Sequence, residues 1–383
     1  MKVIVLSGVN MVEGGILTIY RSVLQSLSRQ RNVKIICLVH RKSLFEGFFS
    51  EDSCVEFLEF PKIKERWFSR IYFEFVTSFF ISKNLKPDLW ICLHDISANV
   101  HNVEQMVYCH NPSPFYKTKF KDFFYDKKFF LFTIFYKLLY KLNIKKNHTV
   151  FVQQEWIAEC FHKWYNVKNL YVTRPQNKKN NEIESHRSSR RKIEPRREII
   201  NLFYPAFPRV FKNIEIIINA MAYLKENRPD IYQRVNIYIT LDETINKYSN
   251  YMYRCISNNN LDNIKLLGLL SSEEVNDFYR DRCDYLLFPS KLETWGLPLT
   301  EAKEYNIPVV AADLPYAHET IGLYDKCKFF DPNDEFLLGN IITDAVNNDL
   351  QLDENNSSID CQWPGLNDWD EFCAYLIKSI KQA

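Results

Sequence analysis

Two glutamates eight positions apart lie in the stretch 288–302, FPSKLETWGLPLTEA, and could contact hydroxyl groups of a ligand. Glu293 lies in the loop after an apolar run, whereas Glu301 lies in the first turn of a helix expected to begin at Pro298. Gly296 would let the backbone approach a ligand closely, and the free amides at the helix start suit a diphosphate. Because carboxylates repel phosphate, we expect the two glutamates to bind sugar or ribose hydroxyls.

Ten short apolar runs, five in each half of the chain, predict the strands that must position such loops. Each is followed by a longer segment with helical spacing, which favours central strands of parallel sheets covered by helices. The runs are 2–7, 33–39, 89–93, 106–110 and 149–153, then 199–205, 235–241, 264–268, 285–290 and 307–313. Because ligands of such sheets bind beyond the carboxyl ends of the strands, we expect the chemistry just after each run.

This alternation predicts an α/β protein with two doubly wound domains. The polar stretch 174–198, rich in Lys and Arg, is expected to be a linker or exposed loop, with nucleic-acid or lipid contact as the alternative. It separates an N-terminal domain, 1–173, from a C-terminal domain, 199–367. The last segment, 368–383, has helical spacing and is expected to join the N-terminal domain.

Composition argues against several classes of protein. The formal net charge of +2 gives no global field for nucleic acid, so none is expected as a partner. The ten cysteines form no C-x-x-C pair, which favours free thiols in the cytoplasm over a zinc site or disulfides. No apolar run is long enough to span a membrane, and the first, VIVL, is expected to be a buried strand rather than a secretory signal.

The residues around the two glutamates resemble the retaining glycosyltransferases of family 4 (glycosyl transferases group 1), which have the GT-B fold. The resemblance implies two Rossmann-like domains facing across a cleft, with a nucleotide-sugar donor held mainly by the C-terminal one. The alternative is an amphipathic helix with ordinary surface glutamates. The matching residues are Ser290, Glu293, Gly296, Leu297, Pro298, Glu301, Ala302, Pro308 and Val309.

By this resemblance, Glu301 should bind the donor ribose and Glu293 should lie near the donor sugar. Glu319, in DLPYAHETIG, stands at a commonly acidic position and could equally be structural. The other donor-binding residues are expected to be Ser290, Thr294, Gly296 and Leu297.

A lysine follows the first predicted strand of the C-terminal half, in LFYPAFPRVFKNIEIIINA. The resemblance implies that Lys212, followed by Asn213, neutralises the leaving diphosphate. Many family members also carry an arginine five positions before the lysine, where this chain has Phe207. Either Arg209 reaches the phosphates by another path, or Lys212 works with less help.

Two stretches of the N-terminal half complete the predicted site. His110 ends a strand in MVYCHNPSPF and matches a histidine that faces the donor sugar in resembling proteins. A buried structural histidine is the alternative, and His94 is the second candidate. Gly14 and Gly15 match a glycine pair that lets the backbone approach the donor phosphate or the acceptor, although a plain tight turn would use the same pair.

The resemblance implies a hexosyltransferase-type enzyme that moves a sugar from a UDP- or GDP-linked donor to a glycan, with retention of anomeric configuration. The resemblance implies no metal and no cofactor, and we expect a lipid-linked acceptor in surface polysaccharide (O-antigen or capsule) biosynthesis. The alternative is a non-catalytic nucleotide- or glycan-binding module derived from such an enzyme. An NAD-linked oxidoreductase would need G-x-G-x-x-G, which SGVNMVEGG does not match.

The stretch 117–146 combines nine lysines and two aspartates with many Phe, Tyr, Leu and Ile residues. Such a segment could lie at the interface of an anionic membrane, with lysines at the headgroups and rings among the acyl chains. This would place the protein peripherally on the cytoplasmic face of the inner membrane. Core helices with outward-pointing lysines would give the same composition.

Overall fold

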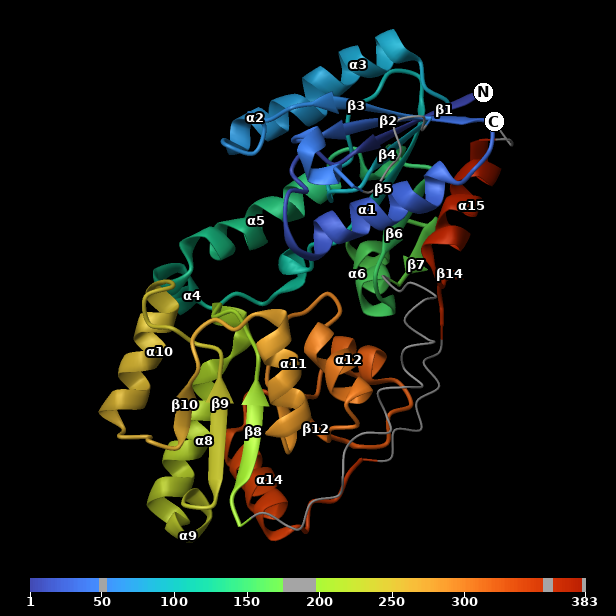
Figure 1. Cartoon of the computed structure of the whole chain (residues 1–383). Coiled ribbons are helices and arrows are strands. Elements are labelled where there is room, and N and C mark those ends of the chain that lie inside the picture. The colour runs from blue at the N-terminus through green and yellow to red at the C-terminus, as the bar shows by residue number, and fades with distance from the viewer. Residues whose placement is uncertain (48–53, 175–197, 354–360, 381–383) are drawn as a thin grey trace. The chain divides into compact units, whose positions relative to one another are not determined.

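The computed structural model describes residues 1–47, 54–174, 198–353 and 361–380, which form two compact units (Figure 1). Unit 1 comprises the described residues of Met1–Pro114, Ile134–Asn180 and Cys361–Ala383. Unit 2 comprises those of Phe115–Thr133 and Asn181–Asp360. Each unit contains one parallel sheet with helices, so the predicted α/β class with two doubly wound parts is confirmed.

The sheet of unit 1 has the order β14-β7-β6-β5-β4-β1-β2-β3, and all its strand pairs are parallel. The chain reverses its direction across the sheet between β1 and β4, which is the switch point where ligands of such sheets bind. The strands are β1 (Lys2–Ser7), β2 (Val33–Val39), β3 (Val55–Glu59), β4 (Leu89–Cys92), β5 (Glu104–Cys109), β6 (Thr149–Val152), β7 (Leu170–Thr173) and β14 (Gly365–Leu366).

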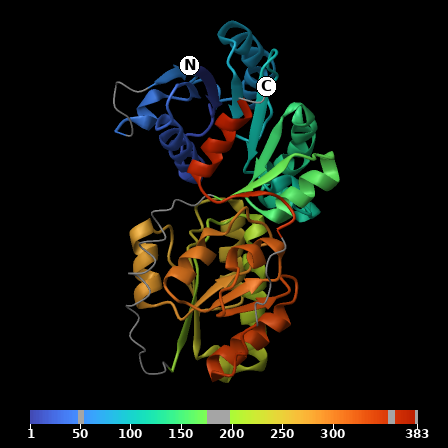
Figure 2. The same ribbon diagram turned by 90° about the vertical axis from the view of Figure 1, so that its right-hand side faces the viewer.

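The helices of unit 1 bury apolar faces against this sheet. The C-terminal helix α15 (Trp369–Ile380) lies beside α1 (Gly14–Ser28), and Figure 2 shows them in red and dark blue. Phe372 and Leu376 are fully buried there, and the Ser26 hydroxyl donates to the Trp369 carbonyl at 3.1 Å. The remaining helices are α2 (Trp67–Tyr72), α3 (Ser78–Leu85) and α6 (Glu155–Tyr165), with a π-helical turn at Phe73–Thr77 between α2 and α3.

The sheet of unit 2 has the order β10-β9-β8-β11-β12-β13 and is also parallel. Counted from β8, this is the order 3-2-1-4-5-6 of nucleotide-binding sheets, with its switch point between β8 and β11. The strands are β8 (Ile200–Tyr204), β9 (Val235–Ile239), β10 (Ile264–Leu266), β11 (Tyr285–Phe288), β12 (Val309–Ala312) and β13 (Cys327–Phe330).

Helices cover both faces of this second sheet, and α5 (Lys127–Lys141) runs from unit 2 into unit 1. Close packing of α14 on α8 uses Gly339, where an added Cβ would stand 3.0 Å from the Tyr223 ring. The helices are α4 (Phe120–Tyr125), α8 (Ile214–Asn227), α9 (Pro229–Tyr232), α10 (Lys247–Asn258), α11 (Ser272–Asp281), α12 (Leu297–Glu304), α13 (Pro315–Ile321) and α14 (Glu335–Asn347).

All ten predicted strands are present, most of them one to three residues shorter than the apolar runs. Four further strands, β3, β7, β13 and β14, were not predicted. Apart from Arg174 and Glu198, the expected linker 174–198 lies outside the described residues. Within the described ranges, no helix has both the length and the apolarity needed to cross a bilayer.

Candidate active site

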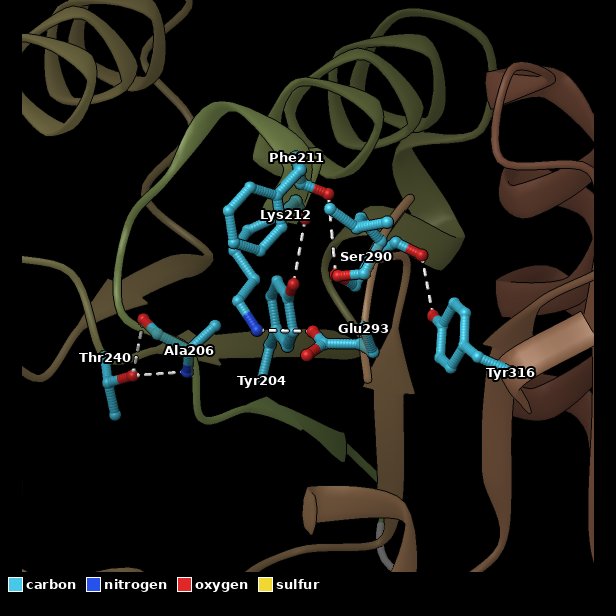
Figure 3. Close-up of polar contacts among 9 residues, drawn as sticks. Tyr204, Ala206, Phe211, Lys212, Thr240, Ser290, Glu293 and Tyr316 are labelled. Atoms are coloured by element: carbon cyan, nitrogen blue, oxygen red, sulfur yellow. Dashed lines mark hydrogen bonds and ion pairs between the residues drawn. The ribbon is translucent and has the colours of Figure 1, made fainter. Parts of the chain in front are cut away.

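The switch point of unit 2 brings two predicted residues together, Lys212 and Glu293 (Figure 3). Lys212 ends a 3-10 turn that follows β8, and Glu293 lies in the loop that follows the adjacent strand β11. Lys212 Nζ donates to Glu293 Oε1 in an ion pair. The two side chains are only 15% and 14% exposed, so water weakens their attraction less than it would on an open surface.

The turn that carries Lys212 is held by hydrogen bonds to its backbone. The buried Tyr204 hydroxyl donates to the Lys212 carbonyl at 2.8 Å. Asn213 follows in the left-handed conformation, with a φ of 56°, which asparagine tolerates better than most residues. Its side-chain amide donates to the carbonyls of Pro289 and Pro332 at 3.2 and 2.9 Å, which joins the lysine turn to the loop after β11.

The loop that carries Glu293 is anchored at Ser290, which is fully buried. The Ser290 hydroxyl donates to the Leu292 carbonyl at 3.2 Å. The Tyr316 hydroxyl donates to the Ser290 carbonyl at 2.6 Å (Figure 3). The backbone amide of Lys291 donates to the Phe211 carbonyl at 2.7 Å. Ser290 therefore stabilises the conformation of this loop from a fully buried position.

Tyr204 and Tyr316 are two members of this site that the sequence did not reveal. Burial raises the pKa of both phenols well above the usual value, and the charge of Glu293 raises it further. Both hydroxyls therefore stay protonated at physiological pH and act as fixed donors to the loops that carry Lys212 and Glu293. Neither tyrosine stands in a recognisable motif, so only the three-dimensional arrangement identifies them.

Arg209 lies on the same turn as Lys212 but has a different partner. Its guanidinium forms an ion pair with Asp126, at the end of α4. It also stands 5.6 Å from the ring centre of Phe129 and 5.9 Å from that of Phe211, within the range of cation–π attraction. The residue at the position of the family arginine, Phe207, is 52% exposed. The structure therefore directs Arg209 toward Asp126 rather than toward Glu293.

The residue just before helix α12, Gly296, has a conformation and surroundings that require glycine. Gly296 is the N-cap, with a φ of +78° in the left-handed region. An added Cβ would stand 3.2 Å from Leu299 Cδ1, so a larger residue would be both strained and crowded. The helix starts at Leu297, which is 59% exposed, one residue before the predicted Pro298. No side chain caps this helix start. Pro298 has no N–H, and the Leu299 amide donates to the Gly296 carbonyl at 2.9 Å, so the dipole of the helix, rather than a row of free amides, is what could attract an anion here.

Glu301 is the fifth residue of α12, one position beyond the first turn in which it was predicted. The carboxyl is largely buried, and this burial raises its pKa above the usual value. The nearby Tyr279 hydroxyl opposes this rise in pKa, although the two groups form no well-aligned hydrogen bond. The Glu301 carboxylate thus keeps acceptor capacity for a ligand. Thr294, in the loop before α12, is partly buried.

In unit 1, His110 follows β5 and is 8% exposed. Its Nε2 lies 2.7 Å from the Leu93 carbonyl, and its Nδ1 lies 3.1 Å from the side-chain nitrogen of Gln153. Because a carbonyl only accepts, Nε2 carries the proton and Nδ1 accepts from the Gln153 amide. Burial lowers the pKa of His110, which favours this neutral form.

Asp95 positions the backbone of His110. It has a φ of 78°, and its Oδ1 accepts from the amides of His110 and Asn111 at 2.6 and 2.9 Å. The second candidate, His94, points elsewhere: its Nε2 lies 2.8 Å from Glu74 Oε1, and both side chains are buried. In the structure, His94 therefore packs against the π-helical turn that carries Glu74.

Gly14 and Gly15 begin α1, and both are exposed. Gly14 has a φ of +65°, and a Cβ at either residue would meet nothing within 4 Å. The N-cap, Glu13, does not cap the helix through its side chain, which pairs instead with Lys64 at 2.9 Å. The space in front of these glycines is therefore open to a ligand.

Other residues with metal or redox potential add no site to this picture. Across the described ranges, no three His, Cys, Asp or Glu residues are grouped to hold a metal. All ten cysteines are free thiols, and most are buried. Glu319, on α13, is 9% exposed.

Comparison with known proteins matches part of the chain to a family model. Residues 185–358 match the family model of glycosyl transferases group 1. A search of the curated proteins found no match to this sequence.

Several solved structures share the architecture of the whole chain. The lipopolysaccharide outer core galactosyltransferase WaaB in its apo form has a TM-score of 0.63 at 13% identity, over 99% of both chains. Sucrose-phosphate synthase from Thermosynechococcus elongatus has a TM-score of 0.63 at 13% identity, over 100% of this chain and 99% of its own. HepE from Anabaena in complex with UDP has a TM-score of 0.56 at 13% identity, over 100% and 98%. The protein therefore has the GT-B fold.

Proposed function

We propose that the protein is a glycosyltransferase that moves a sugar from a nucleotide-sugar donor to a glycan. The Lys212–Glu293 pair at the switch point of unit 2 carries this proposal. Departure of a nucleoside diphosphate develops negative charge on the phosphate, and a fixed cation there lowers the barrier most. Lys212 supplies this cation, and the positive end of the α12 dipole adds to it.

The remaining residues take roles that fit their surroundings. Glu301, a largely buried carboxylate with acceptor capacity, receives hydrogen bonds from the ribose hydroxyls. Glu293 accepts hydrogen bonds from the hydroxyls of the donor sugar. His110 is neutral, and both of its ring nitrogens are bonded within the protein, so it lies near the sugar without bringing a charge. Gly14 and Gly15 let the helix amides of α1 approach the donor phosphate or the acceptor.

We further propose retention of the anomeric configuration, with the acceptor attacking from the face that the diphosphate leaves. Because Lys212 and the α12 dipole meet the phosphate charge, we propose that the reaction needs no metal. Proton NMR of the new glycosidic linkage, against a donor of known configuration, tests retention. Equal rates with and without EDTA would support metal independence, and loss of the reaction in EDTA would refute it.

The first donor to try is UDP-linked, because HepE has been solved with UDP and with UDP-glucose. WaaB and WaaG belong to lipopolysaccharide synthesis by their descriptions, which supports a lipid-linked acceptor in surface polysaccharide assembly here. A nucleotide-sugar donor and ten free thiols both suit the cytoplasm, so we place the reaction there.

A thermal-shift screen against UDP, GDP, CDP, ADP and their sugars tests donor binding. A ligand that binds only the folded protein at 100 times its Kd adds about 2.7 kcal/mol of stability. We expect selective stabilisation by one nucleotide, followed by transfer or slow hydrolysis of its sugar conjugate. Stabilisation without turnover toward any glycan would instead identify a nucleotide-binding module, and no stabilisation by any nucleotide would refute the donor site.

A further inference from the structure

Helix α5 is apolar on two opposite faces, which is unusual for a helix at a protein surface. Its inner face consists of residues spaced by four, three and four positions, which places them on one side of a helix. Each is at most 4% exposed, so this face already has its packing partners. The inner residues are Phe129, Thr133, Tyr136 and Tyr140.

The outer face repeats the same spacing two residues later, with Leu131, Phe135, Leu138 and Leu142. Their exposed fractions are 37%, 48%, 60% and 49%. Two residues correspond to a rotation of about 200°, so the outer row lies nearly opposite the inner one. Leu142 follows the last helical residue, but its amide still donates to the Leu138 carbonyl at 3.1 Å. Four large apolar side chains therefore form one exposed row.

The exposed charges of the segment 117–146 itself are positive. Both aspartates of 117–146 are turned inward: Asp122 is 2% exposed and accepts from the Lys119 amide at 2.7 Å, and Asp126 pairs with Arg209. Every lysine of the segment is exposed. They are Lys117, Lys119, Lys121, Lys127, Lys128, Lys137, Lys141, Lys145 and Lys146.

We propose that the outer face of α5 docks onto an anionic lipid bilayer. Leucine and phenylalanine side chains enter the acyl region, and the flanking lysines meet the phosphate headgroups. Charge favours this occupant over a second copy of the chain, since a second copy would bring its own lysines to the contact and repel the first. The proposal stands apart from the transferase assignment, although docking would bring the protein to a lipid-linked acceptor.

Sedimentation of the full chain with vesicles tests the proposal. We expect binding to phosphatidylglycerol–phosphatidylethanolamine vesicles, at least about tenfold weaker binding to phosphatidylcholine, and a loss of binding with added salt. Leu138→Ser with Leu142→Ser should weaken binding to the anionic vesicles by about tenfold or more, because two apolar side chains no longer insert. The matched control is Leu269→Ser with Leu323→Ser, at exposed fractions of 62% and 79% elsewhere in the chain, which should leave binding unchanged.

A charge series tests the lysines separately. Lys141→Glu with Lys145→Glu should also weaken anionic-vesicle binding by about tenfold or more, whereas Lys247→Glu with Lys265→Glu should change it little. Thermal melts establish that each variant is folded. Undiminished vesicle binding by the folded leucine variant would overturn the proposal. The proposal would also be overturned if light scattering showed that the wild type is a dimer and that the leucine variant is a monomer. UDP stabilisation is measured on the same variants, so failure of membrane docking and failure of donor binding are distinguishable.

Discussion

Lys212 and Glu293 form an ion pair beyond the carboxyl ends of two adjacent strands, with 15% and 14% of their side chains exposed. The carboxylate holds the ammonium in place. An incoming diphosphate carries the same sign of charge as Glu293 and would compete for the same lysine. If Lys212 meets this diphosphate as proposed, the two members of the pair should respond differently to mutation.

We expect Glu293→Gln to bind UDP, or whichever nucleotide the screen identifies, at least as tightly as the wild type. The reason is that Lys212 loses its competing carboxylate. Transfer should fall about 10²-fold, since an interaction with the reacting sugar is removed. Calorimetric titration and initial rates measure the two effects. Weaker nucleotide binding with an unchanged rate would show that Glu293 acts on the nucleotide instead.

Lys212→Ala should lower turnover by about 10²- to 10³-fold, the usual cost of losing a fixed charge-stabilising group. It should also destabilise the fold by about 1–3 kcal/mol, because Glu293 is left unpaired in a shielded site. Adding Glu293→Gln should recover much of this stability but none of the turnover. A double variant that regains turnover would make the lysine structural.

Arg209→Ala provides a comparison on the same turn. Because Arg209 is paired with Asp126 and lies over Phe129 and Phe211, we expect the substitution to lower the melting temperature and reduce turnover less than Lys212→Ala does. The same purified variants are measured by thermal melt and by initial rate. A loss of turnover equal to that of Lys212→Ala in a folded protein would instead place Arg209 on the phosphates.

Most of the strands that the sequence revealed are central strands. The exceptions are β10, an edge strand that was predicted, and β7, a buried strand that was not. Runs such as VKIICLV and YLLFPS are apolar on both faces because helices cover both sides of a central parallel strand. β3 and β13 are edge strands, and each carries a charged side chain, as in VEFLE and CKFF, so their runs look like loops. β14 has only two residues, too few for any pattern.

The site was predictable where residues project from strand ends and less so where they act through tertiary contacts. Lys212 lies in the connection after β8, and Ser290 and Glu293 lie in the loop after β11. These two strands are neighbours in the sheet, so the proximity of the residues follows from strand order. The partner of Arg209, Asp126, lies 83 positions away in the sequence, so no local pattern predicts this contact. The same holds for Gln153, which is 43 positions from His110.

Nucleotide affinity should depend on the protonation of Glu301. Burial raises the pKa of this carboxyl, so as pH falls it protonates earlier than an exposed glutamate and loses its capacity to accept from the ribose. Affinity should therefore fall as pH decreases through the raised pKa, and Glu301→Gln should weaken binding at neutral pH and flatten this profile. Calorimetric titrations over a pH series measure both effects.

The stability of the same variant gives an independent check on Glu301. Since the folded protein holds this proton more tightly than the unfolded chain, the ionised carboxyl costs stability above its unfolded pKa. Glu301→Gln should thus raise the melting temperature near neutral pH, and the gain should vanish below the unfolded pKa. A variant that is destabilised near neutral pH would contradict the burial of a charged carboxylate.

His110 should remain neutral through the physiological range. Its lowered pKa means that the folded state disfavours the imidazolium, so its contribution to stability is present above the ordinary histidine pKa and lost as pH falls through the lowered one. Nitrogen-15 NMR of labelled histidine should show the Nε2–H tautomer and titration below the ordinary value. A protonated ring at neutral pH would require a different role in transfer.

Alanine substitutions in the glycine pair at the start of α1 can separate an effect on stability from an effect on transfer. Gly15 has open space around its Cβ position and no positive φ, so Gly15→Ala should stabilise the helix by up to about 1 kcal/mol. Gly14→Ala should instead cost about 1–2 kcal/mol, because its φ is +65°. If the α1 amides approach a ligand, Gly15→Ala should slow transfer at least tenfold while the melting temperature rises. A more stable variant with an unchanged rate would show that the pair only forms a turn.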